Sequence, residues 1–172
     1  ANLLNKNGWV KDLDWGEEVI TAKDFPCYLE GPDNNTKLSI WYESGVRKIK
    51  KGQSINFSKN TKTSLLLPKG EYGPKFLVTK NYYTLKTYNN SDLYALYVAH
   101  LSDLIGGKVQ KFIAPWKYSS PLDKKSIFSL QEKLMKNGYN VGGYDGLIGH
   151  KTRRSLGLWQ KKTGQKITCF PD

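Results

Sequence analysis

The chain has 172 residues, of which 38% are hydrophobic, and a formal net charge of +12 from 27 basic and 15 acidic side chains. This is enough apolar material for one buried core, or for a larger and a smaller domain. No apolar run approaches the roughly 18 residues of a membrane-spanning helix, so the sequence predicts no transmembrane segment. Such a charge favours an anionic partner, which could be nucleic acid, a membrane surface or an acidic polymer. The basic residues are spread along the chain, which favours a Lys-rich solubilising surface over a dedicated nucleic-acid groove.

Short elements are predicted over the first third of the chain. The opening "ANLLNKNGW" has the pattern of a helix that ends near Gly8, and it reads as the middle of a longer protein. A strand is predicted at Val19–Ile20, and a loop over 25–35, where Pro, Gly and Asn are frequent. A short helix is predicted over 36–44, with Thr36 as its N-cap.

A small sheet is predicted from the segments that follow. The basic stretch 46–57 is expected to form a hairpin that turns at Gly52. Two apolar runs, Ser64–Pro68 and Lys75–Thr79, flank the turn-forming sequence "KGEYGP" and are typical of antiparallel strands. Together with the strand at Val19–Ile20 they predict a sheet of three strands.

A longer amphipathic helix is predicted after residue 91. Ser91 is a good N-cap and Gly106–Gly107 a good stop. The helical spacing predicts one core-facing apolar side, formed by Leu93, Leu96, Tyr97, Leu101, Leu104 and Ile105. Tyr88, Asn89 and Asn90 precede the helix, and one cap would have sufficed. From these residues alone, two interpretations remain open. Either Tyr88 packs on the sheet and the amides cap the helix, or these side chains belong to a functional site.

A separate C-terminal unit is predicted beyond a linker at 114–122 that contains two prolines and two serines. Two helical faces, Ile127/Leu130/Leu134 and Leu156/Trp159, are expected to form its core, with a glycine-rich loop around Asp145 between them. The two cysteines, Cys27 and Cys169, match no zinc or redox motif. They are either unpaired thiols or, in an oxidising compartment, a disulfide that closes a very long loop.

The C-terminal unit resembles the three-helix type of peptidoglycan-binding domain. The motif residues are Leu130–Gln131, Asp145–Gly146, Gly149, Thr152–Arg153 and Trp159–Gln160. Most of them serve as scaffold, because glycines permit the loop to turn and Asp145 can accept backbone N–H groups. The resemblance makes Tyr144, Asp145, Arg153 and Trp159 the candidates for peptidoglycan contact, although Trp159 is also expected in the core.

The first 110 residues resemble the C-terminal part of the catalytic domain of the lytic murein transglycosylase B family. The matching pieces are "ANLLNKNGW", "WGEEV", "SLLLP" and "GPKFLVTKNYYTLKTYNNSDLYAL". The resemblance implies a lysozyme-like fold and cleavage of the β-1,4 bond between N-acetylmuramic acid and N-acetylglucosamine, with a 1,6-anhydro product. It also implies that Tyr88 and Asn89 line the substrate groove, with Ser91 and Tyr94 close behind.

The same resemblance implies a glutamic acid that protonates the glycosidic oxygen and then accepts a proton from the muramyl 6-hydroxyl. None of the six glutamates has the expected motif: Glu17, Glu18, Glu30, Glu43, Glu71 and Glu132. We therefore expect the acid upstream of Ala1 and no catalytic residue in this chain. The alternative is a peptidoglycan-anchoring fragment with no activity of its own; a nucleic-acid binder is supported by charge alone.

The predicted fold class is mainly α with a small antiparallel sheet. Its parts are the C-terminal portion of a lytic transglycosylase catalytic domain (1–113), a linker (114–122) and a peptidoglycan-binding domain (123–172). The implied partners are glycan strands, stem peptides and the missing N-terminal part of the enzyme, with no nucleic acid, cofactor or metal. The implied location is the bacterial periplasm, with a membrane anchor on the full-length protein left open. A Cys27–Cys169 disulfide would join the two domains there.

Overall fold

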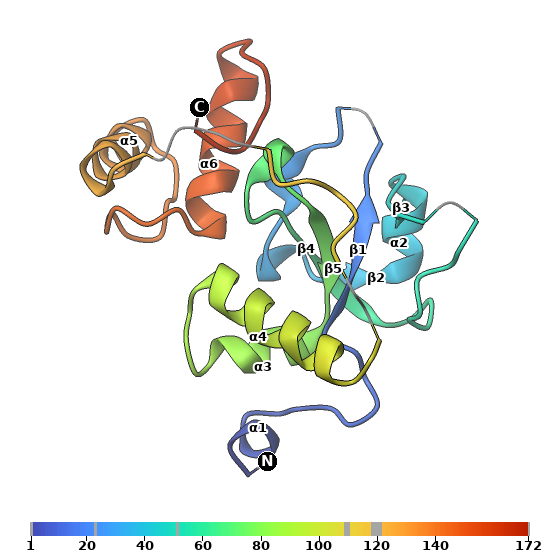
Figure 1. Cartoon of the computed structure of the whole chain (residues 1–172). Coiled ribbons are helices and arrows are strands. Elements are labelled where there is room, and N and C mark those ends of the chain that lie inside the picture. The colour runs from blue at the N-terminus through green and yellow to red at the C-terminus, as the bar shows by residue number, and fades with distance from the viewer. Residues whose placement is uncertain (1, 23, 51, 109–110, 118–121, 172) are drawn as a thin grey trace.

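The computed structural model describes residues 2–22, 24–50, 52–108, 111–117 and 122–171 (Figure 1). At its centre is a five-stranded antiparallel sheet with the order β2-β4-β5-β1-β3. The strands are β1 (Gly16–Ile20), β2 (Thr36–Lys37), β3 (Arg47–Lys48), β4 (Lys62–Leu66) and β5 (Lys75–Val78). The helices are α1 (Asn2–Lys6), α2 (Leu38–Glu43), α3 (Lys80–Lys86), α4 (Asp92–Ile105), α5 (Lys124–Lys136) and α6 (His150–Lys162). The predicted fold class is confirmed.

The sheet carries a separate hydrophobic core on each face. Successive side chains of a strand point to opposite faces, so β4 sends Leu65 to one core and Leu66 to the other. Leu65 packs with Trp41 of α2 in the first core. Leu66 packs with Phe76 and with the buried side of α3 and α4 in the second. The two central strands predicted from apolar runs are thus confirmed.

Three local predictions were wrong because pairing across the sheet decided the outcome. Thr36 does not cap α2: it lies in β2, paired with Thr63, and Lys37 occupies the N-cap position. The segment 46–57 does not form its own hairpin, because β3 pairs with β1 through Val19↔Lys48. The sheet has five strands rather than three, since β2 and β3 each add two residues to an edge.

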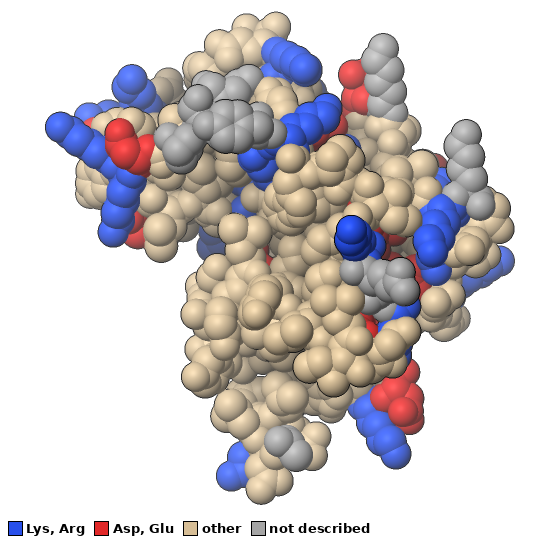
Figure 2. All heavy atoms as spheres, viewed as in Figure 1, with Lys and Arg blue, Asp and Glu red and all other residues tan. Residues whose placement is uncertain are grey.

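Helix α4 begins as predicted but turns a different side to the core. Ser91 Oγ accepts a hydrogen bond from Tyr94 N, which confirms the N-cap. The buried residues of α4 are Ala95, Leu96 and Ala99. These residues pack into the second core, and α3 is the neighbouring helix. The larger side chains of α4 lie outside: Leu93, Tyr97, Leu101, Leu104 and Ile105 are exposed. In Figure 2 the surface over α3 and α4 is largely uncharged.

The C-terminal unit (residues 122–171) packs directly against the N-terminal lobe (residues 2–113). Helix α6 lies against the short 3-10 turn Cys27–Leu29. Cys27 and Cys169 form a disulfide, so the open choice between paired and free thiols is settled in favour of the bridge. Both cysteines are fully buried. Gly157 of α6 is required there, because a Cβ at this position would lie 2.2 Å from Cys169 Sγ.

Candidate functional site

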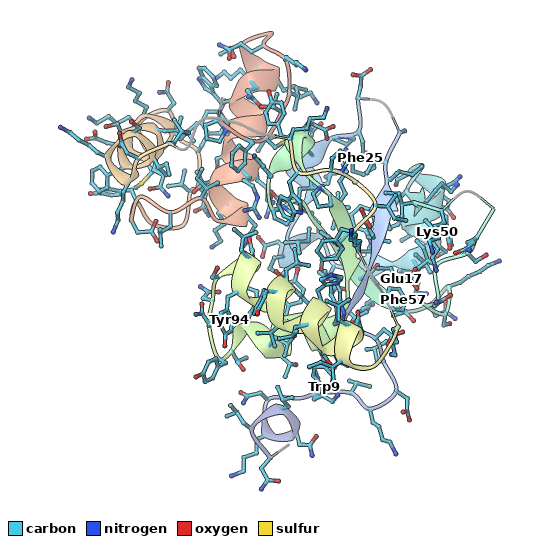
Figure 3. All side chains as sticks on the ribbon, viewed as in Figure 1. Trp9, Glu17, Phe25, Lys50, Phe57 and Tyr94 are labelled. Atoms are coloured by element: carbon cyan, nitrogen blue, oxygen red, sulfur yellow. A yellow bond between two sulfur atoms is a disulfide. The ribbon has the colours of Figure 1, made fainter. Side chains whose placement is uncertain are left out.

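The residues singled out before α4 form an exposed aromatic pair. Tyr88 and Tyr94 stack with ring centroids 6.1 Å apart and an interplanar angle of 27°. Tyr88 is 72% exposed and Tyr94 is 37% exposed, so Tyr88 does not pack on the sheet. Figure 3 shows Tyr94 on the first turn of α4. We call Tyr88 and Tyr94 the tyrosine pair. Two roughly parallel aromatic faces open to solvent are suited to stacking on the apolar face of a sugar ring.

Two polar side chains shape the turn that carries the tyrosine pair. Asn89 Oδ1 accepts a hydrogen bond from Ser91 N at 3.0 Å, and Ser91 Oγ accepts one from Tyr94 N at 3.3 Å. Asn89 therefore has a turn-stabilising role, while its side-chain N–H groups remain available on an exposed surface. The hydrogen bonds of this capped turn, together with the ring stack, bring all four candidate residues together: Tyr88, Asn89, Ser91 and Tyr94.

A buried aspartate lies directly behind this turn. Asp92, the first residue of α4, accepts hydrogen bonds from Lys86 Nζ at 2.5 Å and from Arg153 Nη2 at 2.8 Å. Its main-chain oxygen accepts a third from the Tyr82 hydroxyl at 3.0 Å. Burial alone would raise the pKa of Asp92, but Arg153 and Lys86 outweigh it and hold that pKa below its usual range.

Arg153 also forms the main polar contact between the C-terminal unit and the N-terminal lobe. Its Nε and Nη2 donate to Glu30 Oε1 and Oε2 at 2.7 and 3.0 Å, a bidentate pair that is fully buried. Leu67 N also donates to Glu30 Oε2, at 3.1 Å. Burial raises the pKa of Glu30, an effect that Arg153 opposes. The role of Arg153 in peptidoglycan contact stays a prediction, and its guanidinium is committed to these acceptors.

None of the six glutamates lies next to the tyrosine pair as a free acid. Glu17 binds Lys48 Nζ at 3.1 Å and accepts from Asn56 N. Glu18 accepts from the backbone N–H groups of Ile113 and Ala114, at 2.7 Å each. Glu71 and Glu132 each form an ion pair with the lysine four residues later in the chain. Glu30 binds Arg153, and Glu43 is exposed on α2. The described part of the chain thus offers sugar-binding groups without an acid beside them.

A cavity lies elsewhere in the lobe. It has a volume of about 850 Å³ and is lined by Trp15, Glu17, His100 and Asp103, among others. His100 and Asp103 belong to the second half of α4, whereas the tyrosine pair lies at its first turn. Trp15 Nε1 donates to Asp103 Oδ2 at 2.6 Å, so this carboxylate has a structural partner. The cavity therefore does not include the predicted site residues.

In the C-terminal unit the structure pairs Tyr144 with a residue that sequence reasoning missed. Phe128 of α5 and Tyr144 are both exposed and meet edge to face at 4.9 Å. Asp145 accepts from Leu147 N at 2.9 Å, which agrees with its scaffold role. Trp159 is half-buried against the small core of the unit. Phe128 directly follows Ile127 of the predicted apolar face, and this position could have marked it in the sequence as an exposed aromatic residue.

His150 is partly buried where the two parts of the chain meet, and this setting predicts that the stability of the fold depends on pH. A Cβ on Gly31 would lie 2.7 Å from His150 Cδ2, so the ring abuts the lobe closely. Burial lowers the pKa of His150 from 6.5 to about 4. Between these two pH values the unfolded chain binds the proton and the folded chain does not, so stability falls as the pH falls.

The measurement is urea unfolding of the wild type and of His150→Asn at several pH values. The stability difference between the two proteins should change through the window from 6.5 to about 4 and stay constant above it. Other titrating groups are common to both proteins and cancel in this difference. A constant difference over the whole range would show that His150 titrates normally in the folded chain.

Comparison with known proteins identifies the family and the fold of the chain. The model of the transglycosylase SLT domain matches residues 1–103. Two crystal structures of SltB3 from Pseudomonas aeruginosa, in complex with NAG-anhNAM-pentapeptide and with NAG-NAM-pentapeptide, share 31% identity with the chain at a TM-score of 0.82. They cover 99% of the chain, which confirms the predicted lysozyme-like fold.

The chain spans less than half of the length of the solved relatives that it matches. It corresponds to 45% and 46% of the length of the two SltB3 chains. No curated protein sequence matches the chain. The described residues contain no helix long and apolar enough to cross a membrane. Because the family model covers more than half of the chain, the chain belongs to the transglycosylase SLT domain family.

Proposed function

We propose that this chain is part of a peptidoglycan lytic transglycosylase of the murein transglycosylase B type. The parent enzyme cleaves the MurNAc-β-1,4-GlcNAc bond and forms 1,6-anhydro-MurNAc. One observation carries the proposal: nearly the whole chain shares its fold with SltB3, which was solved with an anhydro-sugar peptide. The basic surface is compatible with this polymer, because stem peptides carry free carboxylates.

In this function the tyrosine pair and Asn89 bind the glycan. The stacked rings of Tyr88 and Tyr94 offer an exposed apolar face to a sugar. Asn89 is exposed beside them, and an amide can donate to a sugar hydroxyl or to a carboxyl group. Ser91 holds the turn through its bond to Tyr94 N. These residues orient substrate, and none of them transfers the proton that the reaction requires.

The acid–base glutamate comes from a segment outside this chain. All glutamates of the chain lie away from the tyrosine pair or are engaged with other partners. More than half of SltB3 has no counterpart here. The exposed side of α4 supports the proposal that a further segment packs on it, because five large uncharged side chains are exposed there in a strongly basic chain. Leu93, Tyr97, Leu101, Leu104 and Ile105 form that side.

The C-terminal unit acts as a peptidoglycan-binding domain of the three-helix type, over residues 123–172. The exposed pair of Phe128 and Tyr144 gives it an aromatic surface of its own. The enzyme works in the bacterial periplasm, where the Cys27–Cys169 disulfide is stable. A second candidate function, a non-catalytic anchoring fragment, is favoured by the lack of an acid beside the tyrosine pair.

The chain by itself is expected to bind insoluble peptidoglycan and to release no anhydro-muropeptides. The reason is that it carries sugar-binding side chains but no positioned acid. Co-sedimentation with purified sacculi measures binding, and mass spectrometry of the soluble fraction measures turnover. Anhydro-muramyl products from the chain alone would contradict the missing acid. Loss of binding to sacculi with retained binding to DNA would contradict the proposed function altogether.

In a protein that also contains the acid, Asn89→Ala is expected to lower turnover about 10- to 100-fold, the range for one hydrogen bond to a charged group. The melting temperature should change little, because Asn89 is exposed and its side-chain hydrogen bond to a described residue is a local turn contact. Asn90→Ala is the matched control, since Asn90 is exposed in the same turn. Equal losses of rate and melting temperature in Asn89→Ala would assign the residue to capping alone.

A further inference from the structure

The C-terminal unit reaches the tyrosine pair through one buried contact. Arg153 extends from α6 to the first residue of α4, where Nη2 lies 2.8 Å from Asp92 Oδ2. Arg153 and Asp92 are separated by 61 residues and belong to different parts of the chain. The side chain of Arg153 is 1% exposed and that of Asp92 is 10% exposed, so water screens their attraction little.

Asp92 is held at three points while the turn in front of it is exposed. Lys86 and Tyr82 approach it from α3, and Arg153 approaches it from α6. Among the described residues, the hydrogen bonds of Tyr88 and Asn89 are short-range, and Tyr88 also stacks with Tyr94. The position of the exposed turn therefore depends on how firmly the start of α4 is fixed.

Arg153 is well suited to fixing that position. Its fork donates to Glu30 through Nε and Nη2, and to Ile148 O through Nη1 at 3.0 Å. These bonds hold the guanidinium rigidly, so Nη2 meets Asp92 from a fixed direction. A lysine offers one ammonium on a flexible stem and does not present this geometry. The contact is thus an arginine-specific link from the C-terminal unit to the start of α4.

We propose that Arg153 is a positioning residue for glycan binding. Through Asp92 it fixes the first turn of α4 and so holds Tyr88 and Tyr94 in the stacked arrangement that receives a sugar ring. The C-terminal unit then contributes to the glycan site of the lobe, in addition to any wall binding of its own. The sugar-binding consequence rests on the proposed function; the coupling between Arg153 and the tyrosine pair does not.

The test is Asp92→Asn in the full chain, which removes the charge that both Arg153 and Lys86 contact and leaves the Glu30–Arg153 pair and the disulfide in place. Two readouts are recorded well below the melting temperature. The first is the set of nuclear Overhauser contacts between the rings of Tyr88 and Tyr94. The second is the affinity for tetra-N-acetylchitotetraose, followed by titration. We expect weaker ring contacts and an affinity at least about fivefold lower, the lower end of typical coupling between sites.

The matched control is Asp33→Asn. It breaks the ion pair between Arg154 Nη1 and Asp33 Oδ2, at 2.6 Å, which also joins the C-terminal unit to the lobe. This pair is exposed and does not touch α4, so both readouts should match the wild type. If the control changes them as much as Asp92→Asn does, general loosening between the two parts explains the effect and the proposal is overturned.

The remaining outcomes separate the inference from the proposed function. Unchanged ring contacts and affinity in a folded Asp92→Asn would overturn the positioning role. If the ring contacts depend on Asp92 but the wild type binds no oligosaccharide, the positioning role of Arg153 stands and the sugar-binding role of the tyrosine pair is overturned. If Asp92→Asn does not fold, Arg153→Lys tests the same contact from its other side. It is expected to weaken both readouts, and unchanged readouts in it would refute the proposal.

Discussion

Arg153→Met is expected to lower the free energy of unfolding by about 3–5 kcal/mol, the usual cost of removing one partner from a buried ion pair. Glu30 would then remain fully buried with its charge uncompensated, because Arg153 supplies two of its hydrogen bonds. Met has a similar length and retains much of the apolar packing. The measurement is urea or thermal unfolding of the purified chain with its disulfide intact.

Arg154→Met is the neighbouring control for this prediction. Arg154 is partly exposed and pairs with the exposed Asp33, so its removal should cost less than about 1 kcal/mol. The double variant Arg153→Met/Glu30→Leu should recover a large part of the lost stability, because no buried charge is left unpaired. Similar losses in the Arg153 and Arg154 variants would contradict the assignment of the buried pair as the main polar contact between the two parts.

Replacing both cysteines by alanine is expected to destabilise the chain by about 2–5 kcal/mol. Cys27 and Cys169 are 142 residues apart, and the chain-entropy model assigns roughly 5 kcal/mol to a loop of that length. Without the bridge, the unfolded chain gains most of its conformational freedom back. The C-terminal unit would then be held to the lobe by Arg153, by the Arg154–Asp33 pair and by the packing of α6.

Unfolding of the oxidised wild type and of the double alanine variant measures this loss. Mild reductant is expected to act slowly on the folded wild type, because both sulfur atoms are fully buried. A loss below about 1 kcal/mol would show that the bridge adds little to the docking of the two parts. Combining the cysteine and Arg153 replacements should release the C-terminal unit from the lobe, which limited proteolysis can detect.

Local sequence determined the elements whose stabilising contacts are close in the chain. The N-cap of α4 needs only Ser91 and the N–H three residues later, and both are visible in the sequence. The apolar runs of β4 and β5 predicted two central strands, because a strand buried on both faces needs continuous apolar residues. The motif pieces also indicated a lytic transglycosylase, and the match to the transglycosylase SLT domain confirms this broader assignment.

Helix α4 shows where periodicity alone was insufficient. The apolar spacing correctly predicted a helix, but five of the six expected core residues are exposed. Periodicity reports which side chains share a face, and it does not report which neighbour that face meets. The side that carries Ala95 and Ala99 is buried instead, beside α3, and this choice depends on the shape of the neighbouring surface.

The central strands, helix α4, the aromatic turn before it and the family resemblance could all be predicted from the amino-acid sequence. The pairing of Cys27 with Cys169, and the contacts of Arg153 with Glu30, at a separation of 123 residues, and with Asp92, became apparent only in the folded chain. Such pairings depend on how separate elements dock, because a charge or a thiol carries no local signal of its distant partner. Burial of the Arg153 charge is tolerated only where the docked surfaces supply carboxylates at hydrogen-bonding distance, and that condition exists in the folded chain alone.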